Sequence, residues 1–411
     1  MNSKRAHTLI LASTALCLAV ALMLFPKESL EASVRGMNIW WNVVFPSLLP
    51  FFIVSELLIS FGVVTLLGSL LEPFMRPLFR VPGIGGFVWA MGLASGNPAG
   101  AKLSARLRKE NKITKIEAER LVSFTSSSNP LFIFGAVAVG FFHNPALGIL
   151  LALAHYGANL MVGLMMRFYG VRDHSASEFK NEDTIVRGTP LKNMVTILHK
   201  EHQKDGRPLG KILGDAVQSS VRTLLMIGGF IILFSVINKV LSLLEVINLL
   251  SIFVSFLLSF ISLPTELSQP IISGLFEMTI GAGQISETTE ASLLHQVIAV
   301  SFLLGFSGLS IQAQVASILA ETDIRFKPFI IGRILQGILA SVLSLLLFKP
   351  IYLERRHVTL YEQVVPTFQV HSFSENIWTI FLTYSPLITL IFLMLSIFIW
   401  TKERLYPHKT A

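Results

Sequence analysis

Long apolar runs, separated by short polar segments, extend over most of the 411-residue chain. A transmembrane helix needs about 20 consecutive apolar residues, and many of these runs come near that length. We therefore expect an all-α, polytopic membrane protein. The expected apolar segments are 9–25, 39–61, 121–141, 146–168, 219–241, 245–263, 268–285, 294–319, 328–348 and 377–400.

Two neighbouring apolar segments contain helix-breaking or polar residues. Segment 82–103 carries Gly96, Pro98 and five further glycines, and it is too short to cross a bilayer and return as helix. We predict a re-entrant hairpin there. Residues 125–130 read Thr-Ser-Ser-Ser-Asn-Pro and interrupt segment 121–141, which predicts a broken transmembrane helix because lipid does not tolerate unpaired polar groups. Two such segments in succession indicate a transporter binding site.

The second half of the chain echoes the first. Met, Gly and an amide residue occur with one spacing in 91–97 and again in 278–284, and Ser128 falls near Ser307. We predict two inverted repeats, each with a re-entrant hairpin and a broken transmembrane helix. Inversion requires segment 245–263 to lie at the interface or only part-way in the membrane. Hydropathy alone favours a full span there, which would reverse the topology of everything that follows.

The polar segments predict how the chain is organised. Seven Lys and Arg residues between 102 and 120, and a mixed-charge stretch from 171, indicate cytoplasmic loops, and Lys4 and Arg5 place the N-terminus in the cytoplasm. The expected parts are an N-terminal signal-anchor helix and loop (1–38), a first repeat (39–170), a polar cytoplasmic loop (171–218), a second repeat (219–350), and a polar loop with a C-terminal transmembrane helix (351–411).

Composition narrows the class of protein. Charged residues make up 14% of the chain, against about 25% in soluble domains. The net charge of +8 fits the basic excess of cytoplasmic loops, so we expect no nucleic-acid partner. Cys17 is the single cysteine, which excludes a disulfide within the chain. The sequence has no P-loop, GxSxG or HExxH signature and no metal-ligand spacing, so we expect no enzyme, no cofactor and no metal.

Polar residues inside the apolar segments are the candidate site. Serine and asparagine at 126–129 could bind an anion at a half-helix end, or serve only to pack helices closely. Asn97 and Gln284 could bind substrate or cap half-helices. Glu277 is a candidate coupling-ion or proton site, unless it is neutral or paired with a buried arginine. The candidate substrate-binding residues are Gly96, Asn97, Ser126, Ser127, Ser128, Asn129, Gln284, Ser307 and Gln312.

Other intramembrane polar residues have a structural interpretation. Glu56 is costly in a span unless it faces the protein interior. His155 and Asn159 are one helical turn apart, and we expect them to form hydrogen bonds between helices.

Several stretches resemble a known family. GLASGNPAGAKL (92–103), ERLVSFTSSSNPLFIFGAV (119–137) and LLEPFMRPLFRVPGIGGF (70–87) are similar to the YlbJ-type sporulation integral membrane proteins of spore-forming Firmicutes. That family carries a nucleoside-recognition or Gate domain, similar to the hairpin-bearing core of concentrative nucleoside carriers. The resemblance implies a role in late sporulation. It also implies transport of dipicolinic acid from the mother cell across the outer forespore membrane.

Two other functions stay open at this point. The chain could carry a nucleoside or another small solute, although the first hairpin offers no acid for ribose hydroxyls. It could also be a membrane scaffold that does not transport and recruits a partner through the loop beginning at 171. Broken helices favour transport, because a scaffold has no need of polar groups at membrane depth. The sequence leaves open a homo-oligomer or a sporulation protein partner.

Overall fold

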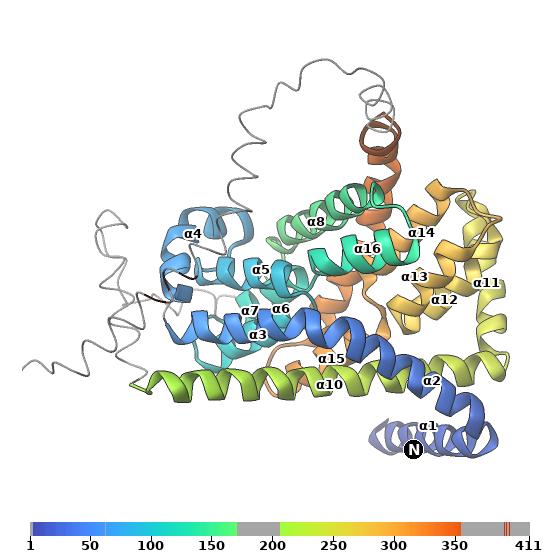
Figure 1. The fold of residues 1–411 in the computed structure, drawn as a ribbon, viewed down its shortest axis with the longest axis horizontal. Coiled ribbons are helices and arrows are strands. Elements are labelled where there is room, and N and C mark those ends of the chain that lie inside the picture. The colour runs from blue at the N-terminus through green and yellow to red at the C-terminus, as the bar shows by residue number, and fades with distance from the viewer. Residues whose placement is uncertain are drawn as a thin grey trace, which may run out of the picture. The chain divides into compact units, whose positions relative to one another are not determined.

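The computed structural model describes residues 3–61, 63–170 and 206–354, together with 390, 392 and 394. Every regular element in these residues is a helix (Figure 1). Residues 1–355 form one unit, and the fold described here is that of this unit. Most of the expected cytoplasmic loop and nearly all of the expected C-terminal span 377–400 lie outside the described residues.

The N-terminal part contains more helix than the sequence predicts. Its elements are α1 (Ser3–Leu24), α2 (Pro26–Ile39), η1 (Trp40–Val44) and α3 (Phe45–Ser60). Residues 26–38, expected as a loop, form most of α2, which bends by 105° from the preceding helix. Pro26 in the first turn and Glu28 near the helix N-terminus both favour a start there. The wide turn η1 precedes Pro46, whose missing N–H disrupts a regular helix.

The first half of the molecule contains both predicted interruptions. Its further elements are α4 (Val63–Phe79), α5 (Ile84–Ser95), α6 (Ala99–Lys109), α7 (Lys115–Thr125), η2 (Phe132–Phe141) and α8 (Leu147–Met166). Helices α5 and α6 have 12 and 11 residues and pack on each other. At 1.5 Å per residue each is about 17 Å long, too short for a bilayer core of about 30 Å. The chain leaves helix again at 126–129, so the broken helix is confirmed.

The second half begins with the longest helix. Its elements are α10 (Leu209–Leu243), α11 (Val246–Phe260), η4 (Thr265–Leu267), α12 (Ser268–Phe276), α13 (Met278–Glu287), α14 (Leu293–Phe306), α15 (Gly308–Leu319), α16 (Phe326–Leu347) and η5 (Phe348–Leu353). Helix α10 starts ten residues before the expected segment and runs alongside α2 and α3 (Figure 1). Helix α11 has 15 residues, about 22 Å, which is shorter than a full span.

The two halves repeat the same order of elements. A hairpin break and a helix break lie 30 residues apart in each half, at Asn97 and Ser127 and again at Glu277 and Ser307. The second hairpin therefore turns at Glu277, and the predicted alignment of Gly96 with Gly283 is wrong. That alignment is based on identical or similar residue types. The residue at the second turn is Glu277, which differs in type from Gly96, Asn97 and Pro98 at the first turn.

Contacts between the halves are reciprocal. Helix α6 packs on α15, and their counterparts α13 and η2 pack on each other. Helix α7 packs on α16 in the same way that α14 packs on α8. Exchanged contacts of this kind are what a two-fold relation between the halves produces. The inverted orientation in the membrane stays a prediction.

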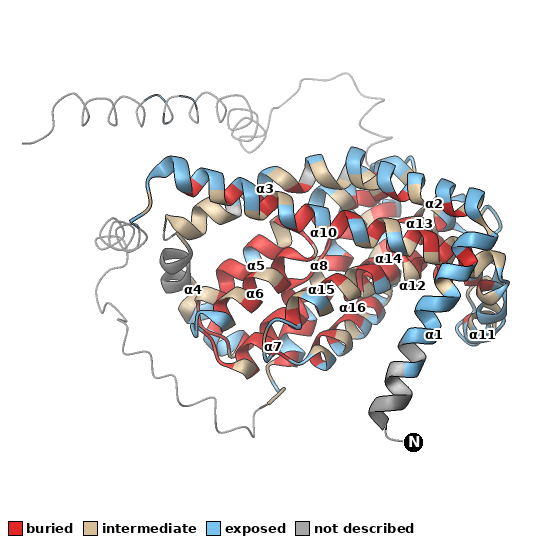
Figure 2. Cartoon of the chain, turned by 90° about the horizontal axis from the view of Figure 1, so that it is seen from below, coloured by how far each residue is buried: buried red, intermediate tan, exposed pale blue. Residues whose placement is uncertain are grey.

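The centre of the unit is buried and its periphery is apolar. Helices α5, α7 and α8 carry most of their residues in the interior, whereas the described side chains of α1 are largely exposed (Figure 2). Helix α11 exposes large apolar side chains such as Ile252, Phe253 and Phe260, as expected of a surface that faces lipid. Four described helices are long and apolar enough to cross a membrane, or up to six if each bent pair counts as one span.

Candidate functional site

Four helix interruptions meet at the centre of the unit. A Cβ atom on Gly96, at the first hairpin turn, would lie 3.1 Å from the backbone nitrogen of Asn129. Asn97 at the same turn donates from Nδ2 to the Ser307 hydroxyl over 3.3 Å. A Cβ atom on Gly308 would lie 3.1 Å from the nitrogen of Met278, beside the second hairpin turn. Both hairpin turns and both broken helices are thus joined by a series of direct contacts.

Glycines let the first hairpin approach the broken helix. Cβ atoms on Gly92 and Gly100 would lie 2.1 and 2.2 Å from the carbonyl oxygen of Thr125, the last residue of α7. Gly96 itself has φ +82°, which glycine adopts without strain. These positions explain why most glycines of this segment lie within helices rather than at the turn. Only residues 96–98 break the hairpin.

Much of the polar run Ser126–Asn129 is used to hold its own conformation. The side-chain carbonyl of Asn129 accepts from the Phe132 N–H over 2.7 Å and so caps the helix that begins at Pro130 and continues as η2, while its side-chain amide donates to the Ser95 carbonyl over 3.4 Å. Hydroxyls of Ser126 and Ser127 donate over 3.4 Å to backbone carbonyls, of Val122 and Gly92 respectively. These bonds give the run a structural role. They also stabilise the helix break, which leaves the other polar groups of the run free to bind an anion, so the packing and the binding interpretations are compatible.

Other buried polar atoms around the same break have no partner among the described residues. They are the hydroxyls of Ser95, Thr125 and Ser128, and Oδ1 of Asn97. Ser95 and Thr125 are fully buried. A buried polar atom without a hydrogen bond costs about 1–3 kcal/mol, so such atoms call for an explanation in a native fold. A polar ligand bound at the break would provide hydrogen-bond partners for all four atoms.

His155 and Asn159 on α8 connect the break to two other helices, α5 and α16. The Ser128 N–H donates to His155 Nε2 over 3.0 Å, so this nitrogen accepts and the ring proton lies on Nδ1. Asn159 donates to the Gln336 carbonyl side chain over 3.3 Å and accepts from the Trp89 indole over 3.2 Å. The expected helix-to-helix bonds of His155 and Asn159 are confirmed.

Arg333 is the largest fully buried side chain among the described residues, and it is absent from the candidates predicted from the sequence. It lies on α16 and donates from Nη2 to the Ser123 carbonyl over 2.6 Å, and from Nη1 to the Ser126 carbonyl. It thereby caps the C-terminal end of α7 at the break. The rule that identified Glu277, that an ionisable residue inside an apolar segment is functional by default, applies equally to Arg333 in segment 328–348.

Glu277 lies at the second hairpin turn and caps a half-helix. Its carboxylate accepts from the Ile280 N–H over 2.9 Å and from the Thr279 hydroxyl. The residue is 3% exposed. The predicted alternative in which Glu277 pairs with a buried arginine is wrong for the described residues, because these two donors are its hydrogen-bond partners there. A role as a coupling site stays a prediction.

The remaining candidates divide into two groups. Ser307 lies at the second helix break with φ +71°, and Gln312 is buried and donates to the Phe306 carbonyl over 3.2 Å, so both belong to the cluster. Gln284 does not lie at a hairpin turn as predicted. It lies within α13 and is exposed, because the second hairpin turns seven residues earlier.

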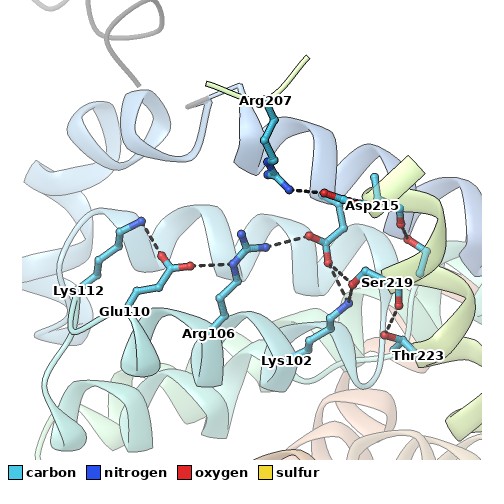
Figure 3. Close-up of polar contacts among 11 residues, drawn as sticks. Lys102, Arg106, Glu110, Lys112, Arg207, Asp215, Ser219 and Thr223 are labelled. Atoms are coloured by element: carbon cyan, nitrogen blue, oxygen red, sulfur yellow. Dashed lines mark hydrogen bonds and ion pairs between the residues drawn. The ribbon is translucent and has the colours of Figure 1, made fainter. Parts of the chain in front are cut away.

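A separate ionic ladder runs along α6. Glu56 on α3 forms ion pairs of 2.9 Å with Lys102 and with Arg106, and accepts from the Ser219 hydroxyl on α10 over 3.0 Å. Arg106 continues to Glu110 and Glu110 to Lys112, as Figure 3 shows. Glu56 therefore faces the protein interior, as predicted. The two carboxylates of the ladder pair with three of the seven basic residues between 102 and 120.

A second set of ion pairs joins the two halves, and we call it the loop clasp. Arg108 donates with two nitrogens to Asp323, both at 2.9 Å. The Arg325 guanidinium donates to both oxygens of Glu119 over 2.8 and 2.9 Å. The hydrogen bonds from Arg108 hold the pKa of the Asp323 carboxyl below its usual value. The clasp links the α6–α7 region to the loop between α15 and α16.

Metal chemistry has no candidate site in the described part of the chain. No group of three or more His, Cys, Asp and Glu residues there could hold a metal ion.

Comparisons of the sequence with known proteins identify its family. The family model described as Gate, nucleoside recognition, matches residues 41–144, which include the first hairpin and broken helix. No solved structure matches. The sporulation integral membrane protein YlbJ of Bacillus subtilis (strain 168) is 55% identical over 404 residues, which cover 98% of each chain. The chain belongs to the YlbJ family of sporulation integral membrane proteins.

Proposed function

We propose that this protein is a transporter for a small organic anion, and that the anion is dipicolinate. The observation that carries the proposal is the meeting of four helix breaks, with unpartnered buried polar atoms at their centre. A helix that only anchors a scaffold gains nothing from such breaks, since each removes backbone hydrogen bonds inside the membrane. In transporters, broken helices and hairpin turns at the junction of two repeats form the substrate site.

The chemistry of the cluster suits a planar dicarboxylate. Hydroxyls of Ser95, Thr125 and Ser128 can donate to carboxylate oxygens, and Arg333 places a permanent positive charge beside the same break. Aromatic rings of Phe124 and Trp89 stand 6.4 Å apart nearby and could line an aromatic substrate. The sporulation family supplies the biological setting.

The proposal includes the membrane, the direction of transport and the partners. Transport runs from the mother cell across the outer forespore membrane, with the N-terminus in the cytoplasm. The bilayer and the substrate are the partners that the function needs. A homo-oligomer or a sporulation protein would be additional.

A nucleoside is the second candidate, because the matching family model is described as nucleoside recognition. Ribose hydroxyls pair well with acidic groups. Glu277, the one acid that the described residues place at the cluster, already accepts two hydrogen bonds within its own hairpin. This arrangement favours the anion over the nucleoside.

Reconstitution tests the proposal directly. The purified full-length protein is placed in liposomes, and uptake of labelled dipicolinate is measured with and without excess unlabelled nucleoside; protein-free liposomes are the control. We expect saturable dipicolinate uptake that the nucleoside does not inhibit. Saturable nucleoside uptake without dipicolinate uptake would replace the substrate, and uptake of neither would favour the scaffold.

A further inference from the structure

The guanidinium of Arg333 has no carboxylate partner among the described residues. Its terminal nitrogens donate to the carbonyls of Ser123 and Ser126, and its Nε has no acceptor. The side chain is fully buried, with the Phe329 ring 5.5 Å from its central carbon. Arginine cannot be deprotonated in proteins, so a full positive charge stays at the break.

Carbonyl groups compensate this charge only in part. They are dipoles at the C-terminal end of α7, and a cation there is stabilised by the helix dipole. Taking an ion out of water without an opposite charge is strongly unfavourable, even when its hydrogen bonds are made. The buried acidic residue of the cluster, Glu277, interacts with Thr279 and Ile280 in the second hairpin instead. Among the described residues, the cation beside the first break thus has no paired anion.

We propose that Arg333 determines the charge of the substrate, whose carboxylate supplies the missing negative charge at the Ser126–Asn129 break. This inference rests on the proposed transport function and adds a residue that sets specificity. An uncharged solute of the same shape leaves the guanidinium uncompensated and binds more weakly. The hydroxyls of Thr125 and Ser128, which have no partner among the described residues, are placed to bind the same carboxylate. Thr125 lies within the segment 123–126 that Arg333 holds, and Ser128 lies two residues beyond it.

A clamp role alone would give a different result. If Arg333 only holds two carbonyls in place, removing its charge disturbs the break equally for charged and uncharged ligands. If it sets specificity, removing its charge weakens the binding of carboxylates selectively. The preference for an acid over its amide therefore separates the two roles, because both ligands have the same shape.

The test measures binding to the purified full-length protein by calorimetry. The ligands are dipicolinate, its uncharged diamide, pyridine-2-carboxylate, benzoate and uridine. Arg333→Gln removes the charge and keeps an amide donor. Arg333→Lys keeps the charge and loses the two terminal guanidinium nitrogens that donate side by side. Lys349→Gln is the matched control, because it removes a charge from an exposed position on the helix that continues α16.

We expect wild-type protein and the Lys349→Gln variant to prefer dipicolinate to the diamide. In Arg333→Gln the Kd for dipicolinate should rise about 10- to 100-fold, the loss of one charge-assisted hydrogen bond, with little change for the diamide. Arg333→Lys should keep the preference at lower affinity. Should the glutamine variant fail to fold, the lysine variant decides, since the proposal requires it to retain the preference.

Other outcomes separate the two proposals. Binding of benzoate or pyridine-2-carboxylate but not dipicolinate, lost selectively in Arg333→Gln, would overturn the substrate and support the role of Arg333. An equal loss for acid and diamide would overturn that role while leaving dipicolinate transport intact. Wild-type protein that binds only uridine, or none of the ligands, would overturn both.

Discussion

The first helix break extends over four non-helical residues, whereas the second consists of Ser307 alone. Around the first lie unpartnered buried hydroxyls and the cation Arg333. Beside the second lies the acidic residue Glu277, whose carboxyl group caps α13. The same order of helices therefore carries a basic residue at one break and an acidic residue beside the other. The comparison teaches that the repeated scaffold supplies the geometry, and that a few side chains give the first break its binding capacity.

The largest effect should come from filling the contact between the first hairpin and its broken helix. In Gly92→Ala and Gly100→Ala the new Cβ would meet the Thr125 carbonyl at 2.1 and 2.2 Å, so the backbone has to move. Overpacking of a close-packed interior costs about 1–3 kcal/mol or more. We expect a clear fall in the midpoint of thermal unfolding in detergent and loss of dipicolinate uptake.

Gly229→Ala is the matched control for this prediction. A Cβ there meets nothing within 4 Å, and the residue lies in helix α10. Alanine is the better helix former by about 1 kcal/mol, so this variant should be at least as stable as the wild type. Equal behaviour of the three variants would show that the hairpin does not pack as closely as described.

Glu277 tests the second break. Glu277→Gln removes the charge and keeps an acceptor for the Ile280 N–H, whereas Glu277→Ala removes both. If the carboxylate couples transport to an ion, both variants lose accumulation against a gradient and keep downhill flux. Only the alanine variant should also lose stability, by about 0.5–2 kcal/mol, because a cap is lost. Full pH-dependent accumulation by the glutamine variant would leave Glu277 as a cap and nothing more.

Asn129 separates capping from binding at the first break. Asn129→Asp keeps an oxygen that accepts from the Phe132 N–H, and it adds a negative charge where we place the carboxylate of the substrate. We expect near-normal stability with a Kd for dipicolinate raised about tenfold or more. Asn129→Ala should lower stability by about 0.5–2 kcal/mol. An aspartate variant that binds dipicolinate normally would move the substrate away from this residue.

The smallest effect on stability should come from the loop clasp, which lies at neither of the two helix breaks. Arg108 lowers the pKa of Asp323, so the pair stabilises the fold above the usual aspartate pKa of about 4 and loses this effect as the pH falls through the lowered value. Because Asp323 is largely solvated, Arg108→Gln should cost at most about 1 kcal/mol at pH 7. The difference in unfolding midpoint from the wild type should shrink toward pH 3. A difference that grows with acidity would contradict this.

Much of the fold follows from local sequence signals. Gly96 and Pro98 locate the first hairpin turn, and four polar residues before Pro130 locate the helix break, because these residues do not continue a helix in lipid. The second break is marked only by Ser307 followed by Gly308. At the second hairpin the turn falls on Glu277 between apolar residues, and no glycine or proline indicates it.

The site is less predictable than the fold, because it depends on contacts between distant segments. Arg333 meets the Ser126 carbonyl across 207 residues, and Asn97 meets Ser307 across 210. Sequence spacing carries no information on such pairs. Gln284 is predicted from the sequence to lie at a hairpin turn because its sequence neighbours match those of Asn97. The chain turns at Glu277 instead, and Gln284 lies within α13.

The central claim is that the substrate binds where the four breaks meet, and cysteine protection tests it most directly. In a Cys17→Ser background, Asn97→Cys places a thiol at the meeting point and Gln284→Cys places one on the exposed side of α13. The rate of labelling by a small methanethiosulfonate is measured with and without saturating dipicolinate. We predict that dipicolinate slows labelling at position 97 several-fold and leaves position 284 unchanged. Equal rates at position 97 with and without dipicolinate, in protein that still transports it, would contradict the account.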